Sequence, residues 1–87
     1  MKIKKGFILR KVGSQYVVAA TGEASKSFHG MIRMDESGAF AFELLRKEIT
    51  EQALLAALAE KYSMEEEALQ PDLERFLDKL KEADALV

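Results

Sequence analysis

The stretch that decides the fold joins an apolar strand end to an aromatic-rich helix through an acidic turn of small residues. It reads Met34-Asp35-Glu36-Ser37-Gly38-Ala39-Phe40-Ala41-Phe42-Glu43-Leu44-Leu45. Asp35 or Ser37 can cap the helix, because a short oxygen-bearing side chain accepts a hydrogen bond from an unpaired amide of the first turn. The apolar residues cover so wide an arc that this helix, expected over about 37–47, should be central and buried. The stretch therefore separates a strand-rich first third from a helical remainder.

Upstream of this stretch, two β-rich runs flank a Gly13-Ser14 pair. Residues 7–12 and 15–20 are rich in β-branched and aromatic side chains, and glycine supplies the positive φ that a tight hairpin turn needs. The polar, glycine-containing segment 21–27 is expected to be a loop. A third short strand is expected over about 28–34.

Downstream, two further helices are predicted from capping residues and apolar spacing. Thr50 precedes a second helix over about 51–62, whose leucines and Tyr62 form one inward stripe. Ser63 and Glu66 have the spacing of a capping box, which predicts a third helix over about 64–83.

Pro71 lies inside the third predicted helix, and a kink or break is expected near Gln70 because proline removes a backbone hydrogen bond. Strands come first and helices follow without β–α–β alternation, which indicates the α+β class. We expect one domain over 1–87, with strands within 7–34 and helices within 37–83. A three-stranded antiparallel sheet followed by a three-helix bundle is a winged-helix-like arrangement.

Composition excludes several classes of protein. The 87 residues include no cysteine, so disulfides and thiolate metal sites are absent. The apolar run after the basic N-terminus is only Phe7-Ile8-Leu9, too short for a signal peptide or a membrane span, and we expect a cytoplasmic protein. Residues 1–33 carry seven Lys or Arg against one acid, whereas 34–87 carry six against fourteen. This asymmetry indicates either a charged partner or a solvated, lysine-rich sheet edge.

The residues offer little for catalysis. His29 is the only histidine, so neither a Cys–His pair nor a zinc site can form. The glycines form no phosphate-binding loop, and the acidic run Glu65-Glu66-Glu67 fits a helix start, where negative charge meets the positive end of the helix dipole. We therefore expect a protein that is not an enzyme, with no cofactor and no metal.

A binding role then remains. Residues 64–87 carry eight acids against three bases, which argues against a helix that enters a nucleic-acid groove. An edge-like third strand, with Met31 and Arg33 on one face, can instead accept a peptide as an added strand. A winged-helix DNA-binding regulator and a structural homodimeric subunit are the two alternatives.

From residue 7 to 87 the chain resembles the PqqD family, the pyrroloquinoline quinone biosynthesis D proteins and their relatives. The resemblance rests on the order of strands, on Met34–Leu45, on the Thr-capped helix that ends in Tyr62, and on an Asp-x-x-x-Phe-Leu-x-x-Leu pattern. That pattern is carried by Asp72, Phe76, Leu77 and Leu80. The chain departs from the family at Asp35 (usually Asn), at Phe42 (often Trp), at Lys47-Glu48-Ile49 (usually with Gly) and at Ala85 (often Gly).

The resemblance implies a peptide chaperone, the recognition element of a pathway that modifies ribosomally made peptides. A precursor peptide's leader segment would lie along the third strand, against the third helix, and be presented to a radical S-adenosylmethionine (SAM)-type enzyme. The residues that the resemblance assigns to the peptide are Met31, Ile32, Arg33, Arg75, Phe76, Lys79 and Leu80. From their chemistry, Arg33, Arg75 and Lys79 could pair with acidic leader residues.

Overall fold

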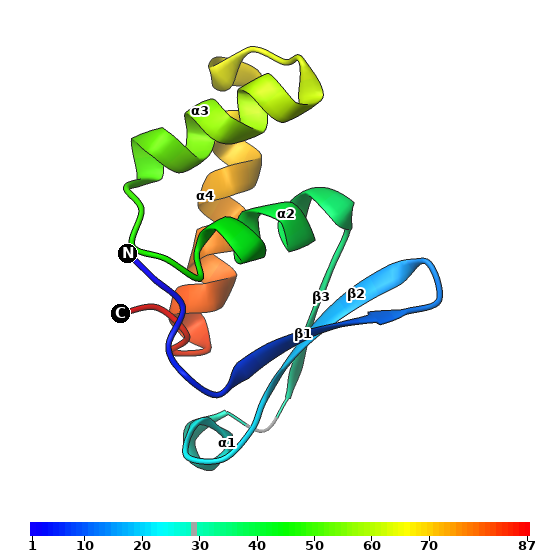
Figure 1. Ribbon diagram of the computed structural model, residues 1–87, viewed down its shortest axis with the longest axis vertical. Coiled ribbons are helices and arrows are strands. Elements are labelled where there is room, and N and C mark those ends of the chain that lie inside the picture. Colours follow the sequence, from blue (N-terminus) through cyan, green and yellow to red (C-terminus); the bar gives the residue numbers. More distant parts are fainter. Residues whose placement is uncertain (29) are drawn as a thin grey trace.

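The computed structural model describes residues 1–28 and 30–87, Ser27 by its backbone alone. Within them it has three strands and four helices (Figure 1). These are β1 (Phe7–Val12), β2 (Gln15–Ala20), α1 (Ala24–Ser27), β3 (Met31–Met34), α2 (Glu36–Leu44), α3 (Glu51–Tyr62) and α4 (Glu66–Glu82). The α+β class is confirmed, since a three-stranded antiparallel sheet is followed by a helical bundle in a winged-helix-like arrangement. The third strand predicted over 28–34 includes His29, which lies outside the described residues.

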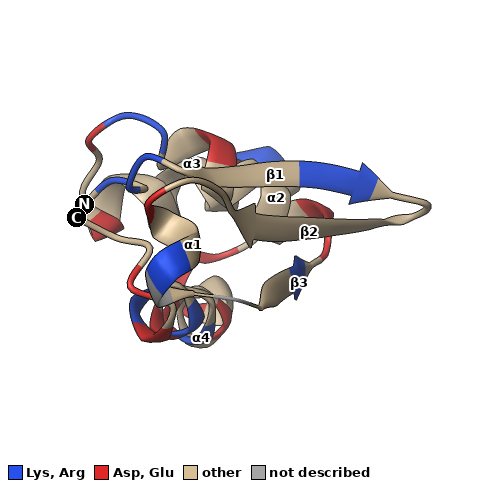
Figure 2. Cartoon of the chain, turned by 90° about the horizontal axis from the view of Figure 1, so that it is seen from below, with Lys and Arg blue, Asp and Glu red and all other residues tan. Residues whose placement is uncertain are grey.

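The sheet has the strand order β1-β2-β3 and is antiparallel throughout. The predicted hairpin is confirmed, and Gly13 adopts φ +63° in its turn. Lys and Arg lie at the far end of β1 and on β3 (Figure 2). Because β2 is central, β3 has a strand neighbour on only one side among the described residues.

One face of the sheet is covered and the other is open. Val18 is fully buried and Ile32 is 9% exposed on the inner face, where α2 packs against β2 and β3. Met31, 64% exposed, and the exposed Arg33 lie on the outer face. The alternation predicted for the third strand is therefore confirmed.

The two predicted helix caps are also confirmed. Asp35 accepts a hydrogen bond from the Gly38 amide at 3.0 Å, and Thr50 accepts one from the Ala53 amide at 3.1 Å. The helix after Asp35 ends at Leu44, before the predicted limit of residue 47.

No helix in the described part of the chain is both long and apolar enough to cross a membrane.

The segment expected to be a loop contains α1 instead. Three backbone hydrogen bonds of 3.1 Å close this short helix, from the amides of Ser25, Lys26 and Phe28 to the carbonyls of Gly22, Glu23 and Ala24. The Ser25 hydroxyl also donates to the Gly22 carbonyl at 2.6 Å. Because Phe28 belongs to this turn, β3 begins at Met31 and not at residue 28 as predicted.

The predicted capping box at Ser63 is wrong. Ser63 has φ 51° and ends α3 in the left-handed conformation, so its backbone cannot also start a helix. α4 begins at Glu66, three residues after Ser63, and Glu65 before it makes no side-chain cap. The helix then continues through Pro71 without a break. The carbonyl that Pro71 leaves without a partner belongs to Glu67, which is exposed, so water can hydrate it, while the buried stripe beyond Pro71 holds the helix in place.

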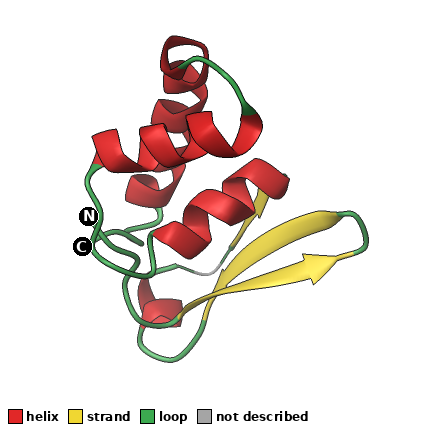
Figure 3. Ribbon diagram, turned by 45° about the horizontal axis from the view of Figure 1, so that its top comes forward, coloured by secondary structure: helices red, strands yellow, loops and turns green. Residues whose placement is uncertain are grey.

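The core lies between the inner sheet face and the last three helices. Its largest fully buried side chains are Phe42, Leu45, Leu54, Leu77, Leu80 and Val18. A terminal strap, residues 1–5 with 85–87, closes one side of this core. It is held by 2.8 Å backbone hydrogen bonds from Ile3 to Leu45, from Lys4 to Ala85 and from Val87 to Lys2. The two chain ends therefore lie side by side (Figure 3).

Candidate functional site

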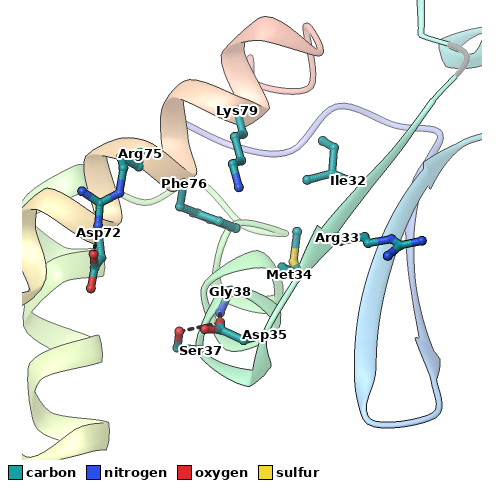
Figure 4. Close-up of a pocket in the computed structure, with 10 residues that line it drawn as sticks. All are labelled: Ile32, Arg33, Met34, Asp35, Ser37, Gly38, Asp72, Arg75, Phe76 and Lys79. Atoms are coloured by element: carbon teal, nitrogen blue, oxygen red, sulfur yellow. Dashed lines mark hydrogen bonds and ion pairs between the residues drawn. The ribbon is translucent and has the colours of Figure 1, made fainter.

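A groove runs between β3 and α4 and is made of two adjoining hollows. The first, of about 370 Å³, is lined by Ile32, Arg33, Met34, Asp35, Ser37, Gly38, Asp72, Arg75, Phe76 and Lys79 (Figure 4). The second, of about 570 Å³, is lined by Phe28, Met31, Ile32, Arg33, Lys79, Glu82 and Ala83. They share Ile32, Arg33 and Lys79, so the hollows form one groove along the strand.

The free edge of β3 borders this groove. Residues Met31–Met34 pair only with β2, and they make no backbone hydrogen bond to any other described element. Half of the amide and carbonyl groups of an edge strand point away from its neighbour and are open to another strand. The edge therefore offers main-chain donors and acceptors directly beside the groove.

Apolar side chains from β3 and α4 meet across the groove, and a lysine lies between them. Ile32 and the half-buried Phe76 face each other from β3 and α4, and Lys79 projects between them (Figure 4). A groove of this kind can bury apolar side chains against Ile32 and Phe76 while Lys79 meets a polar or acidic group.

The predicted site residues do not all face the groove. Arg33 points away from α4, on the open face of the sheet (Figure 4). Arg75 lines the groove, but its guanidinium forms an ion pair with Asp72 one turn earlier in the same helix. Leu80 is fully buried and has no surface to offer a ligand. Ile32, Phe76 and Lys79 lie along the groove, whereas Met31 borders its second hollow from the open face of the sheet.

Gly38 allows α2 to approach β3 closely, a role that the sequence reasoning missed. A Cβ atom at this position would lie 2.8 Å from the Cβ of Met34 and 3.4 Å from the ring of Phe76. The missing side chain thus lets the first turn of α2, the end of β3 and the middle of α4 meet. A glycine in the first turn of an aromatic-rich helix was the available signal, because glycine weakens a helix unless close packing requires it.

Asp35 closes one end of the groove. Its carboxylate accepts hydrogen bonds from the Gly38 amide at 3.0 Å and from the Ser37 hydroxyl at 2.7 Å. These bonds, of which the one from the Gly38 amide has the largest effect, hold the pKa of Asp35 below its ordinary value.

No cluster of three His, Cys, Asp or Glu able to hold a metal ion occurs within the described residues.

A smaller apolar hollow lies behind Phe76. It has a volume of about 70 Å³ between α2, α3 and α4, and Phe76, Gly38 and Tyr62 are among its walls. The Tyr62 hydroxyl is buried there without a hydrogen-bond partner among the described residues. Burial, followed by the nearby Glu36 and Asp35 charges, raises the pKa of Tyr62. Phe76 lines both spaces, so the hollow adjoins the groove.

The fold and groove define a class of small winged-helix-like domains with an open sheet edge facing a helix. The family model described as Coenzyme PQQ synthesis protein D (PqqD) matches residues 13–86, and the chain belongs to this family. A similar solved structure is described as "TbiB1 in Complex with the TbiA(beta) Leader Peptide". It is 20% identical, with a TM-score of 0.74 over 99% of this chain and 94% of that one, and shows that the fold is shared over almost the whole length. No curated protein sequence matches the chain.

Proposed function

We propose that this protein is a non-catalytic module that binds the leader segment of a ribosomally made precursor peptide. The leader lies as an added strand along β3, facing α4. The domain then presents the rest of the peptide to a modifying enzyme of the radical SAM type, in the synthesis of pyrroloquinoline quinone or a related peptide product. The observation that carries the proposal is the unpaired edge of Met31–Met34 beside the groove.

The dimensions of the site suit an extended peptide. Four strand residues span about 13 Å, and the two hollows beside them, of about 370 and 570 Å³, are within the usual size range of ligand sites. Main-chain hydrogen bonds to an edge strand supply affinity that does not depend on sequence, while pockets for alternate side chains select the sequence.

The comparisons support the same proposal. The family to which the chain belongs is described as a coenzyme synthesis protein, and the similar solved structure is described as holding a leader peptide. Both agree with a domain that binds a peptide in a biosynthetic pathway.

The direct test is an NMR titration with the leader half of a short peptide encoded beside this gene. We expect amide shifts at Met31–Met34 and at Phe76 and Lys79. No binding at about 100 μM, which corresponds to about 5.5 kcal/mol, or shifts confined to other residues, would refute the proposal. Light scattering of the same samples separates peptide binding from pairing of β3 with β3 of a second copy.

The strand geometry can be tested separately by methylating backbone nitrogens of the bound peptide. Alternate amides of an added strand point toward β3 and away from it. Methylation of every second residue in one register should therefore abolish binding, whereas methylation of the intervening residues leaves it nearly unchanged. Equal effects of the two methylation patterns would show that the peptide does not bind as a strand.

A further inference from the structure

We propose that the peptide is selected on both faces of the sheet: apolar side chains face α4, and an acidic side chain lies beside Arg33 on the open face. The inference rests on the proposed function and adds the sequence pattern of the ligand.

The register of the sheet extends to any strand that is added. Leu9, Val18 and Ile32 form one row across the three strands on the inner face. Arg10, Val17 and Arg33 form the next row on the outer face. Opposed residues of neighbouring strands point to the same face in either strand direction. A peptide strand at β3 therefore adds one residue to each row, alternately inside and outside.

The inner positions select apolar side chains. Val18 is fully buried and Ile32 is 9% exposed, and the groove continues this surface with Phe28, Phe76 and Ala83. A charged side chain beside Ile32 would lose water without full compensation. Lys79 is the one cation that Figure 4 shows pointing into the groove, and its long stem forms an apolar wall.

The outer position beside Arg33 selects an acid. Arg33 is exposed and forms no ion pair with any described residue. The strands carry Arg10, Lys11 and Arg33 and no acidic residue, as the absence of red on them in Figure 2 shows. Opposite charges directly across neighbouring strands attract, and like charges repel. One position further along this face, the exposed Met31 offers an adaptable apolar contact.

The expected effect of this pair is measurable but moderate, because both charges are solvated. Replacing an attractive cross-strand pair with a repulsive one should weaken binding about three- to tenfold. Arg10 supplies a matched control in the same row. It lies two strands further away, about 14 Å from the added strand, beyond the screening length of about 8–10 Å in physiological salt.

The experiment selects a displayed library of random ten-residue peptides on the full chain and on R33E, R10E and K79E. For wild type we expect alternation of apolar and other residues, with an acid at one non-apolar position. R33E should exchange that acid for Lys or Arg, while R10E keeps it. An enriched peptide is then titrated by fluorescence anisotropy, together with its Glu→Lys version, against wild type and R33E.

The outcomes separate this inference from the proposed function. Enriched peptides without alternation, or with an acid preference that R33E leaves unchanged, overturn the pattern while peptide binding stands. An acid preference that K79E reverses instead places the acid in the groove and also overturns it. Enrichment of no peptide by wild type contradicts the proposed function itself.

Discussion

The contact made by Gly38 predicts that a single added methyl group destabilises both the fold and the groove. In Gly38→Ala the new Cβ would lie 2.8 Å from the Met34 Cβ and 3.4 Å from the Phe76 ring. Unstrained carbon atoms approach to about 3.5–4.0 Å, so either Met34 or the first turn of α2 must move.

Two opposed terms set the size of this effect. Overpacking of a well-packed site costs about 1–3 kcal/mol, whereas replacing glycine by alanine within a helix stabilises by about 1 kcal/mol. The collision is with a Cβ atom, which no rotamer change can move away, so we expect the steric cost to prevail by about 1 kcal/mol. For a domain of this size that lowers the melting temperature by about 4–8 °C.

Thermal unfolding followed by circular dichroism measures the change. The matched control is Gly30→Ala, whose new Cβ would meet only the side chain of Phe28, at 3.4 Å, and whose melting temperature should stay near that of wild type. Because Met34 is the last residue of β3, Gly38→Ala should also weaken peptide binding more than Gly30→Ala does. A melting temperature for Gly38→Ala equal to or above that of wild type would refute this account of the contact.

Other substitutions separate the site from the core. Lys79→Glu should weaken leader binding several-fold, whereas Arg75→Glu should change it less, because the native charge of Arg75 is paired with Asp72. Anisotropy titration measures both, and equal losses of affinity would contradict the side-chain directions seen in the groove. Each should shift stability by no more than about 0.5 kcal/mol. Leu80→Ala should cost about 2–5 kcal/mol in urea unfolding because Leu80 is fully buried; a smaller loss would mean that the site collapses around the cavity. The lowered pKa of Asp35 contributes stability above its unfolded value of about 3.9, and this is lost as pH falls through the folded value. Asp35→Asn, which still caps the helix, should therefore lose less stability than wild type as the pH falls below about 4. If both proteins lose the same stability on acidification, Asp35 is not the source of that loss.

Local signals in the sequence predicted most elements correctly. The hairpin at Gly13, the caps at Asp35 and Thr50, and the two-faced third strand all depend on hydrogen bonds or alternation within a few residues. Ser63 shows where such signals fail. Its spacing to Glu66 fits a capping box, but the left-handed turn that ends α3 uses the same residue, and two overlapping local motifs cannot be ranked by spacing alone.

Side-chain direction at the site could not be predicted from residue type. Arg33 and Lys79 are both exposed cations beside one groove. The pleat of β3 nevertheless turns Arg33 to the open face, whereas the position of Lys79 on α4 directs it into the groove (Figure 4). The close approach at Gly38 joins three elements, so it depends on tertiary packing that no single segment of the sequence encodes.

The terminal strap has a practical consequence for constructing variants of this protein. The amide of Val87 bonds the carbonyl of Lys2, so a short linker can join the two ends and new ends can be opened at the exposed Gly13-Ser14 turn. Neither hollow of the groove is lined by residues 1–5 or 85–87. Attachment at the C-terminus also spares the α-amino group of Met1, which is bonded to Glu48 and Ile49. A dye or a fused enzyme is therefore best placed after Val87, where it leaves β3 free.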